Sequence, residues 1–217
     1  MDDEENTTAT LKILEAKDVI VGELAERGEW VVANIETTSF WPVKAQKVVF
    51  RGETLWILPI MKNRYPAIAM KVPVGKSRQE GEQLLMRFLS NLAWVEEKGF
   101  LVDGIGGGSL PAPMGRDKTR GFAICEEFDL SYFPEPTNDK ALLALALMRE
   151  GRGLNHPGYA FLSFYRVLEV AFPEGRKRGE WITAHVEVIT DHRGKEALAE
   201  LRAQGIADVG IHLRDSG

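Results

Sequence analysis

The feature that most constrains the fold is the long apolar stretch over residues 139–172, DKALLALALMREGRGLNHPGYAFLSFYRVLEVAF. Asn138 is a suitable N-cap before its first half, and Gly151 and Gly153 supply a helix end in its middle. Pro157 fits the first turn of a second helix, where its missing N–H is harmless. The stretch therefore predicts two apolar helices joined by a glycine-rich turn, an αα-hairpin.

The second of these helices carries three polar residues, Ser163, Arg166 and Glu169, among apolar neighbours. Their spacing of three places them in one narrow stripe, in which Arg166 and Glu169 can pair. A stripe that faces solvent is the favoured interpretation. The alternative is a buried stripe whose charges need partners, because an unpaired buried charge is costly.

The N-terminal half is predicted to be rich in β-strands. Its short segments contain β-branched and aromatic residues and are separated by turn signals. These segments are WVVANIE, KAQKVVF, ETLWILPI and YPAIAMKV, followed later by FLVDGI and GFAICEEFDL. Arg51-Gly52-Glu53 predicts a hairpin loop in which the glycine supplies a positive φ, within a β-meander. Residues 11–24 are compatible with a short strand or a short helix, and the sequence does not choose between them.

One amphipathic helix is predicted after these strands. Ser77 and Glu80 have the spacing of a capping box, in which hydroxyl and carboxylate each satisfy a free backbone N–H. Gly99 is a suitable C′ residue at the other end. The apolar residues between them fall on one helical face and are Leu84, Leu85, Phe88, Leu89, Leu92 and Val95. This face is expected to pack on the sheet.

The predicted fold class is α+β, with a β-rich N-terminal half that includes one amphipathic helix, and a helical C-terminal half made of the αα-hairpin and further helices. Residues 1–10 form an acidic leader that is expected to be disordered, and residues 11–136 form the β-rich α+β domain. Residues 137–217 form the helical domain. Because its last residues lack a closing element, we expect that domain to be truncated at its C-terminus.

Composition limits the classes of partner and compartment. The chain has 217 residues and a formal net charge of -5, which gives no general reason to bind nucleic acid, although Arg176, Lys177 and Arg178 form a local basic loop. Cys125 is the single cysteine, and its apolar and acidic neighbours disfavour a reactive thiolate. The acidic N-terminus is unlike a signal peptide, and no apolar run reaches the ~18 residues of a membrane helix. The expectation is a soluble, cytoplasmic protein without a membrane partner.

Several motifs that suggest cofactor chemistry are incomplete. Gly75-Lys76-Ser77 lies where a phosphate-binding loop belongs, but Met70 stands where that motif needs a glycine. The glycines of 104–108 are followed by prolines rather than by a helix start, which favours a flexible crossing or a tight chain approach over a dinucleotide site. Glu126 and Glu127 are adjacent on a predicted strand, so they point to opposite faces. No histidine pattern fits a metal site, and no cofactor is expected.

The segment ALALMREGRGLNHPGYAFLSFYRVLEVAF resembles the bacterial methylamine-utilisation MauJ-like family. The resemblance extends backward over FLSNLAWVEEKGF, GIGGGSLPAPMGR, EEFDL and PEPT, and so covers about residues 80–213. These blocks carry no catalytic signature. The resemblance implies an accessory protein rather than a particular reaction.

The helix FLSFYRVLEV is also similar, more distantly, to the aromatic-rich helix of Apea-like HEPN domains. That similarity implies a ribonuclease with an Arg-x4–6-His motif in a later helix, and Glu169 would match the residue that orients the arginine. Arg149 and His156 have the required spacing, as do Arg178 and His185, but both pairs are predicted to lie outside a suitable helix. The similarity therefore implies a motif beyond Gly217 or in a partner subunit, with Arg166 and Glu169 as supporting residues.

The expected function is that of an accessory protein that binds a protein partner, or a second copy of itself, through its helical half. The alternative is a HEPN-type ribonuclease or RNA-binding defence component. No residue is assigned firmly to catalysis. The candidates are Arg166, Glu169, Arg149 and His156 for a catalytic site, and Arg176, Lys177 and Arg178 for nucleic acid.

Overall fold

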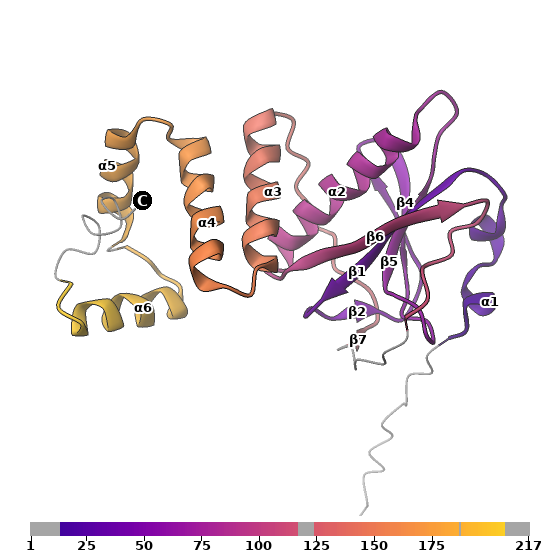
Figure 1. Ribbon diagram of the computed structural model, residues 1–217, viewed down its shortest axis with the longest axis horizontal. Helices are drawn as coiled ribbons and strands as arrows, with labels where there is room; N and C mark the ends of the chain where they lie inside the picture. Colours follow the sequence, from indigo (N-terminus) through magenta and orange to yellow (C-terminus); the bar gives the residue numbers. More distant parts are fainter. Residues whose placement is uncertain (1–13, 117–123, 187, 207–217) are drawn as a thin grey trace, which may run out of the picture. The chain divides into compact units, whose positions relative to one another are not determined.

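A computed structural model describes residues 14–116, 124–186 and 188–206 of the chain. The chain divides into two compact units, 1–135 and 136–217 (Figure 1). The predicted fold class is confirmed, because the first unit is built on an antiparallel sheet and the second is helical. The leader expected to be disordered lies outside the described residues.

The main sheet of the first unit has five antiparallel strands in the order β3-β4-β5-β1-β6. Their bounds are β1 (Trp30–Thr37), β3 (Gln46–Phe50), β4 (Glu53–Leu58), β5 (Ala67–Lys71) and β6 (Phe100–Gly108). The predicted meander is present in β3-β4-β5. Strand β1 lies between β5 and β6 instead of at the start of the meander, an arrangement that the sequence did not indicate.

The turn between β3 and β4 is the predicted hairpin. Phe50 pairs with Glu53, so the loop consists of Arg51 and Gly52 alone, with φ values of 52° and 81°. Positive φ at both central residues gives a turn whose twist matches that of the two strands.

Strand β6 runs through the glycine segment, so of the two favoured interpretations the flexible crossing is wrong. The expected tight chain approach is present, because a Cβ on Gly107 would lie 1.9 Å from the carbonyl oxygen of Trp30 on β1. The Arg78 guanidinium donates a hydrogen bond of 2.6 Å to the Gly106 carbonyl. The glycines therefore allow two strands to approach closely and do not form a dinucleotide loop.

Helix α2 (Arg78–Val95) begins with the predicted capping box. The Ser77 hydroxyl accepts from the Glu80 N–H, and the Glu80 carboxylate accepts from the Ser77 N–H at 2.7 Å. The hydrogen bond from the Ser77 backbone lowers the pKa of Glu80. At the other end Glu97, with φ of 52°, takes the left-handed conformation, so the prediction of Gly99 as C′ residue is wrong.

Both faces of the sheet are covered. The apolar face of α2 packs on one side, as Figure 1 shows, with Leu85, Phe88 and Leu92 fully buried. On the other side lie two short helical turns, α1 (Ala16–Val19) and η1 (Gly22–Ala25), which settles the open choice for residues 14–24 in favour of helix.

The strand predicted over residues 121–130 is much shorter in the described part of that segment. Strand β7 (Ile124–Cys125) pairs in parallel with β2 (Trp41–Pro42). Glu126 and Glu127 therefore follow the strand and do not lie on it, which corrects their predicted placement. Cys125 is half-buried, and burial, together with the Glu96 carboxylate, raises the pKa of its thiol.

The second unit consists of four helices within its described residues, 136–186 and 188–206. They are α3 (Asp139–Gly153), α4 (Pro157–Ala171), α5 (Gly175–Val186) and α6 (His192–Ala203). Helices α3 and α4 lie side by side and form the predicted hairpin (Figure 1). Asn138 caps α3 by accepting from the Ala141 N–H at 2.8 Å, and Pro157 opens α4.

The prediction of a basic loop at Arg176, Lys177 and Arg178 is wrong, because these residues form the first turn of α5. Gly205, with φ of 87°, follows the C-cap residue of α6 in the left-handed conformation that favours glycine. Within the described ranges, no helix is long and apolar enough to cross a membrane.

Candidate functional site

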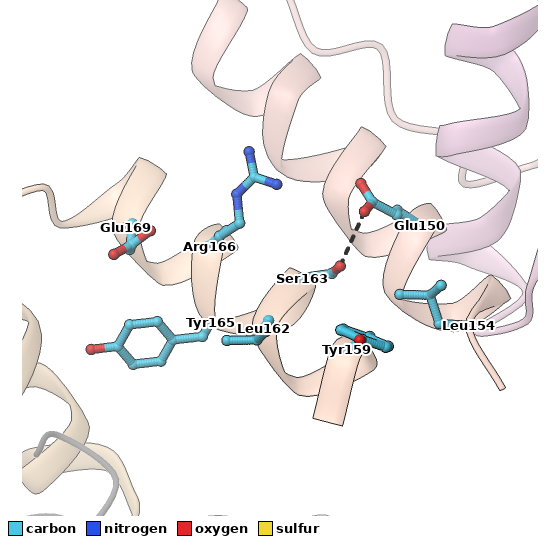
Figure 2. A pocket seen from close by; sticks show the side chains of 8 residues that line it. All are labelled: Glu150, Leu154, Tyr159, Leu162, Ser163, Tyr165, Arg166 and Glu169. Carbon is cyan, nitrogen blue, oxygen red and sulfur yellow. Dashed lines mark hydrogen bonds between the residues drawn. The ribbon is translucent and has the colours of Figure 1, made fainter. Parts of the chain in front are cut away.

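A cavity of about 500 Å³ opens along the α3–α4 hairpin (Figure 2). It is lined by Glu150, Leu154, Tyr159, Leu162, Ser163, Tyr165, Arg166 and Glu169. Most of these side chains come from α4, which presents four of them at intervals of three and four residues. Those four are Tyr159, Leu162, Arg166 and Glu169, named here the α4 stripe. The spacing places the α4 stripe on one helical face.

Local sequence explains why α4 presents this face. His156 is the N-cap and Pro157 the first helical residue, so the start of α4 is fixed. Gly151 on α3 is buried, and a Cβ there would lie 2.6 Å from the Phe164 ring. The missing side chain lets α3 and α4 pack closely, which fixes the rotation of α4 and leaves the α4 stripe on an open side.

Ser163 is the one buried polar residue among those that line the cavity, with 4% of its surface exposed. Its hydroxyl donates to the Glu150 carboxylate over 3.4 Å, the contact drawn in Figure 2. A serine nucleophile and its base lie within about 2.6–3.2 Å of each other, and the base is itself oriented by a third group. The pair in this cavity is longer, and the eight lining residues include no histidine or cysteine.

Two of the four predicted catalytic candidates, Arg166 and Glu169, line the cavity, whereas Arg149 and His156 are not among its lining residues. Arg149 is half-buried in α3, and burial lowers the pKa of its guanidinium, opposed by the Glu150 charge. His156 is exposed, with its ring 4.8 Å from the Tyr159 ring. The structure therefore separates the four candidates into two groups.

The predicted polar stripe is only partly present. Arg166 and Glu169 are exposed, in agreement with a stripe that faces solvent, but Ser163 is buried. The acidic partner expected for Arg166 is engaged elsewhere, since Glu169 lies 3.7 Å from the guanidinium of Arg178 on α5. Within the described ranges Arg166 makes no ion pair with any carboxylate.

The three basic candidates for nucleic acid, Arg176, Lys177 and Arg178, lie on the first turn of α5 and are each matched by an acidic side chain. Arg176 pairs with Glu180 at 3.1 Å, and Lys177 pairs with Glu174 at 2.7 Å. Local pairing reduces the positive potential that a phosphate backbone requires.

Arg178 has a different environment from its two neighbours. Its side chain is 13% exposed, against 78% for Arg176. Its guanidinium donates to the Tyr165 hydroxyl and to the Phe172 carbonyl, both at 3.0 Å, and lies 5.1 Å from the Tyr165 ring centroid. Arg178 therefore joins α5 to α4. This role could not be predicted from the sequence, because Tyr165 and Phe172 lie 13 and 6 residues before Arg178, more than one helical turn away.

The remaining motifs have structural roles. Ser77 caps α2, and Lys76 pairs with Glu53, so both residues of the incomplete phosphate loop have protein partners. His185 lies in the last turn of α5, whereas His192 is the first residue of α6, so the two histidines do not share a helix. No group of three or more potential metal ligands occurs among the residues that the structure describes.

Residues 144–217 match the family model of methylamine utilization protein MauJ. The helical unit resembles the MauJ family. The predicted resemblance is thereby confirmed for this region, which contains α4, the cavity and α5; the sequence blocks quoted between residues 80 and 143 lie outside the match. No curated protein and no solved structure matches the chain. The HEPN similarity gains no support from these comparisons.

Proposed function

We propose that the helical unit is an assembly module, through which the MauJ-like chain pairs with a second copy of itself along the α4 stripe. The observation that carries the proposal is the amount of apolar surface on the α3–α4 hairpin. Six large side chains of this hairpin are at least 36% exposed: Leu143, Leu154, Tyr159, Phe161, Leu162 and Phe164.

Single exposed apolar side chains are common, but clusters of them mark interaction surfaces. Leu162 and Tyr159 are 52% and 62% exposed, and both belong to the α4 stripe and line the cavity. Removing such surface from water is favourable, at roughly 25 cal/mol for each Å² buried. A partner that covers the stripe would therefore gain free energy without refolding the hairpin.

The charges of the α4 stripe favour a second copy as that partner. Arg166 and Glu169 lie three residues apart and have opposite charges, so the stripe carries both halves of an ion pair. A two-fold axis that crosses α4 between them places Arg166 of each copy opposite Glu169 of the other. Such self-complementarity is the property of an isologous dimer interface. Arg166, which has no acidic partner within the described residues, would gain one.

Sedimentation velocity of the full chain over a range of concentrations tests this proposal. The wild type is expected to form dimers, and Leu162→Glu to remain monomeric, because the change places a carboxylate in the apolar part of the stripe. Val74→Glu is the matched control, since Val74 is fully exposed in the other unit. A wild type that is monomeric at every concentration, or equal dimerisation of both variants, contradicts the proposal.

RNA cleavage is the second candidate function, and one observation favours it. Arg178 and His185 lie on a single helix, α5, two turns apart. This placement corrects the expectation that the pair lies outside a suitable helix. Glu169, the residue implied to orient such an arginine, lies 3.7 Å from it. One observation speaks against RNA cleavage, because the Arg178 guanidinium already donates hydrogen bonds to the Tyr165 hydroxyl and the Phe172 carbonyl.

A fluorogenic RNA assay separates the two functions. Cleavage by the wild type that disappears in His185→Ala but persists in His192→Ala would establish the second candidate. Both histidines are exposed, but the His185 ring stacks on the Trp181 ring with 4.5 Å between their centroids, so the helix content of His185→Ala is compared with that of the wild type. The assembly proposal expects no cleavage above the buffer rate.

A further inference from the structure

The first unit contains a cavity of about 540 Å³ that is unrelated to the α4 stripe. It is lined by three segments far apart in the sequence, which contribute Glu15, Ala16, Lys62, Asn63, Arg64, Gly115 and Arg116. Three of these residues are cationic and one is acidic, in a chain whose formal net charge is -5. A local excess of positive charge in an acidic protein calls for an explanation, because it opposes the overall charge.

Backbone hydrogen bonds hold the cavity walls in place. Arg64 and Gly115 form an antiparallel bridge, flanked by the bonds from the Tyr65 N–H to the Met114 carbonyl at 3.2 Å and from the Arg116 N–H to the Asn63 carbonyl at 2.9 Å. A second bridge joins Leu14 to Met61, and the Lys62 N–H donates to the Leu14 carbonyl at 3.0 Å. The cationic side chains therefore project from ordered backbone.

A buried asparagine anchors one of these walls to the sheet. Asn34 on β1 is fully buried, donates to the Gly104 carbonyl at 2.9 Å and accepts from the Met114 N–H at 2.8 Å. Because Met114 precedes Gly115 and Arg116, this contact fixes the segment that forms the wall of the cavity.

The three cations differ in how far their charge is matched. Arg116 is bound by both carboxylate oxygens of Glu36, at 2.8 and 3.0 Å, and its guanidinium lies 5.2 Å from the Tyr65 ring centroid. Lys62 pairs with Glu15 at 3.4 Å, and both side chains are more than half exposed. Arg64 donates to the Pro113 carbonyl at 2.9 Å and has no acidic partner within the described residues. Arg64 is thus the cation that can accept a new counterion.

We propose that this cavity binds a small molecule through an oxyanion, a phosphate or carboxylate group, held by Arg64 and Lys62. The fixed fork of an arginine guanidinium matches the geometry of both groups, and a lysine ammonium adds a mobile positive charge. The volume falls in the range of ligand pockets, about 300–1,000 Å³, so it has room for the rest of the molecule beyond the charged group. Glu15, which lines the same cavity, limits the positive charge available in the unliganded state.

Isothermal titration of the full chain with inorganic phosphate and with acetate, at constant ionic strength, tests this assignment. At least one probe is expected to bind, and the tighter one identifies the oxyanion. Arg64→Gln is expected to weaken binding by at least about tenfold, as for the loss of a charge-assisted hydrogen bond. Arg87→Gln is the matched control, because Arg87 is exposed on α2 in the same unit.

A third variant separates loss of binding from loss of folding. Glu15→Gln removes the carboxylate from the cavity and releases Lys62, so binding should become tighter, an effect that damage to the fold cannot produce. Glu15 is 51% exposed and makes no side-chain capping bond at α1, so the fold should tolerate the change. No binding of either probe, equal binding by Arg64→Gln and Arg87→Gln, or weaker binding by Glu15→Gln overturns the proposal.

Discussion

Replacing Arg178 by methionine removes the polar contacts that join α5 to α4 while it keeps an unbranched apolar stem. Two hydrogen bonds of 3.0 Å are lost, to the Tyr165 hydroxyl and the Phe172 carbonyl, together with the cation–π contact. Hydrogen bonds to a charged group contribute about 1.5–3 kcal/mol each, and a partly exposed cation–π contact about 0.5–1 kcal/mol. The ion pair with Glu169, at 3.7 Å, adds little.

Because Arg178 is mostly buried, these contacts are only weakly screened by solvent, and the lower bounds of these contributions predict a loss of at least about 3.5 kcal/mol. The assay is native-state hydrogen exchange resolved by segment, in which the opening free energy of the α5 amides should fall by that amount. Amides of the main sheet, in the other unit, serve as an internal reference.

Arg176→Met is the matched control, because Arg176 is 78% exposed and pairs only with Glu180 on its own helix. Its expected effect is below about 0.5 kcal/mol, the usual value of such a pair. If Arg178→Met changes the opening free energy of α5 no more than Arg176→Met does, the assigned role of Arg178 is wrong.

Three further predictions concern single residues. Asn34→Ala leaves two buried backbone groups without their partners and should lower the free energy of unfolding by about 3 kcal/mol in urea melts. Gln83→Ala, on the exposed side of α2, is the control and should change this free energy little. Equal effects of the two variants would contradict the anchoring role of Asn34. Glu169→Ala should cost below about 1 kcal/mol in the same melts, since its pair with Arg178 is long and Glu169 is half-exposed; a loss of several kcal/mol would mean a buried pair. Burial raises the pKa of Cys125, so the thiol resists ionisation in the folded state, and the free energy of unfolding should fall as the pH rises through the ordinary thiol range. A Cys125→Ser variant should lose this pH dependence. If its pH profile equals that of the wild type, the pH dependence does not come from Cys125.

The parts of the fold that the sequence predicted depend on neighbouring residues. The Arg51-Gly52 turn, the capping box at Ser77 and the N-cap at Asn138 each involve groups within four residues of one another. Turn and capping preferences are local properties of the chain, and they can therefore be recognised without knowledge of the tertiary structure.

The parts of the fold that the sequence did not predict depend on residues that lie far apart in the chain. Glycine disfavours strands in general, so the sequence did not indicate a strand where Gly107 lies against Trp30 on β1, more than seventy residues earlier. Arg178 belonged to a charged segment, and only the packing of α5 on α4 brings it to Tyr165. The sequence also did not show which apolar residues of α4 are exposed, Leu162 among them, because periodicity shows that a helix is apolar but not which of its faces is covered.

The most direct test of self-association is a charge exchange within the α4 stripe. Arg166→Glu and Glu169→Arg each create like charges across the proposed two-fold contact, so each variant alone should dimerise at least about tenfold more weakly than the wild type. An equimolar mixture restores opposite charges at both contacts. The account predicts that sedimentation velocity finds heterodimers in the mixture at a concentration where each variant alone is monomeric. A mixture that associates no better than its two components would contradict it.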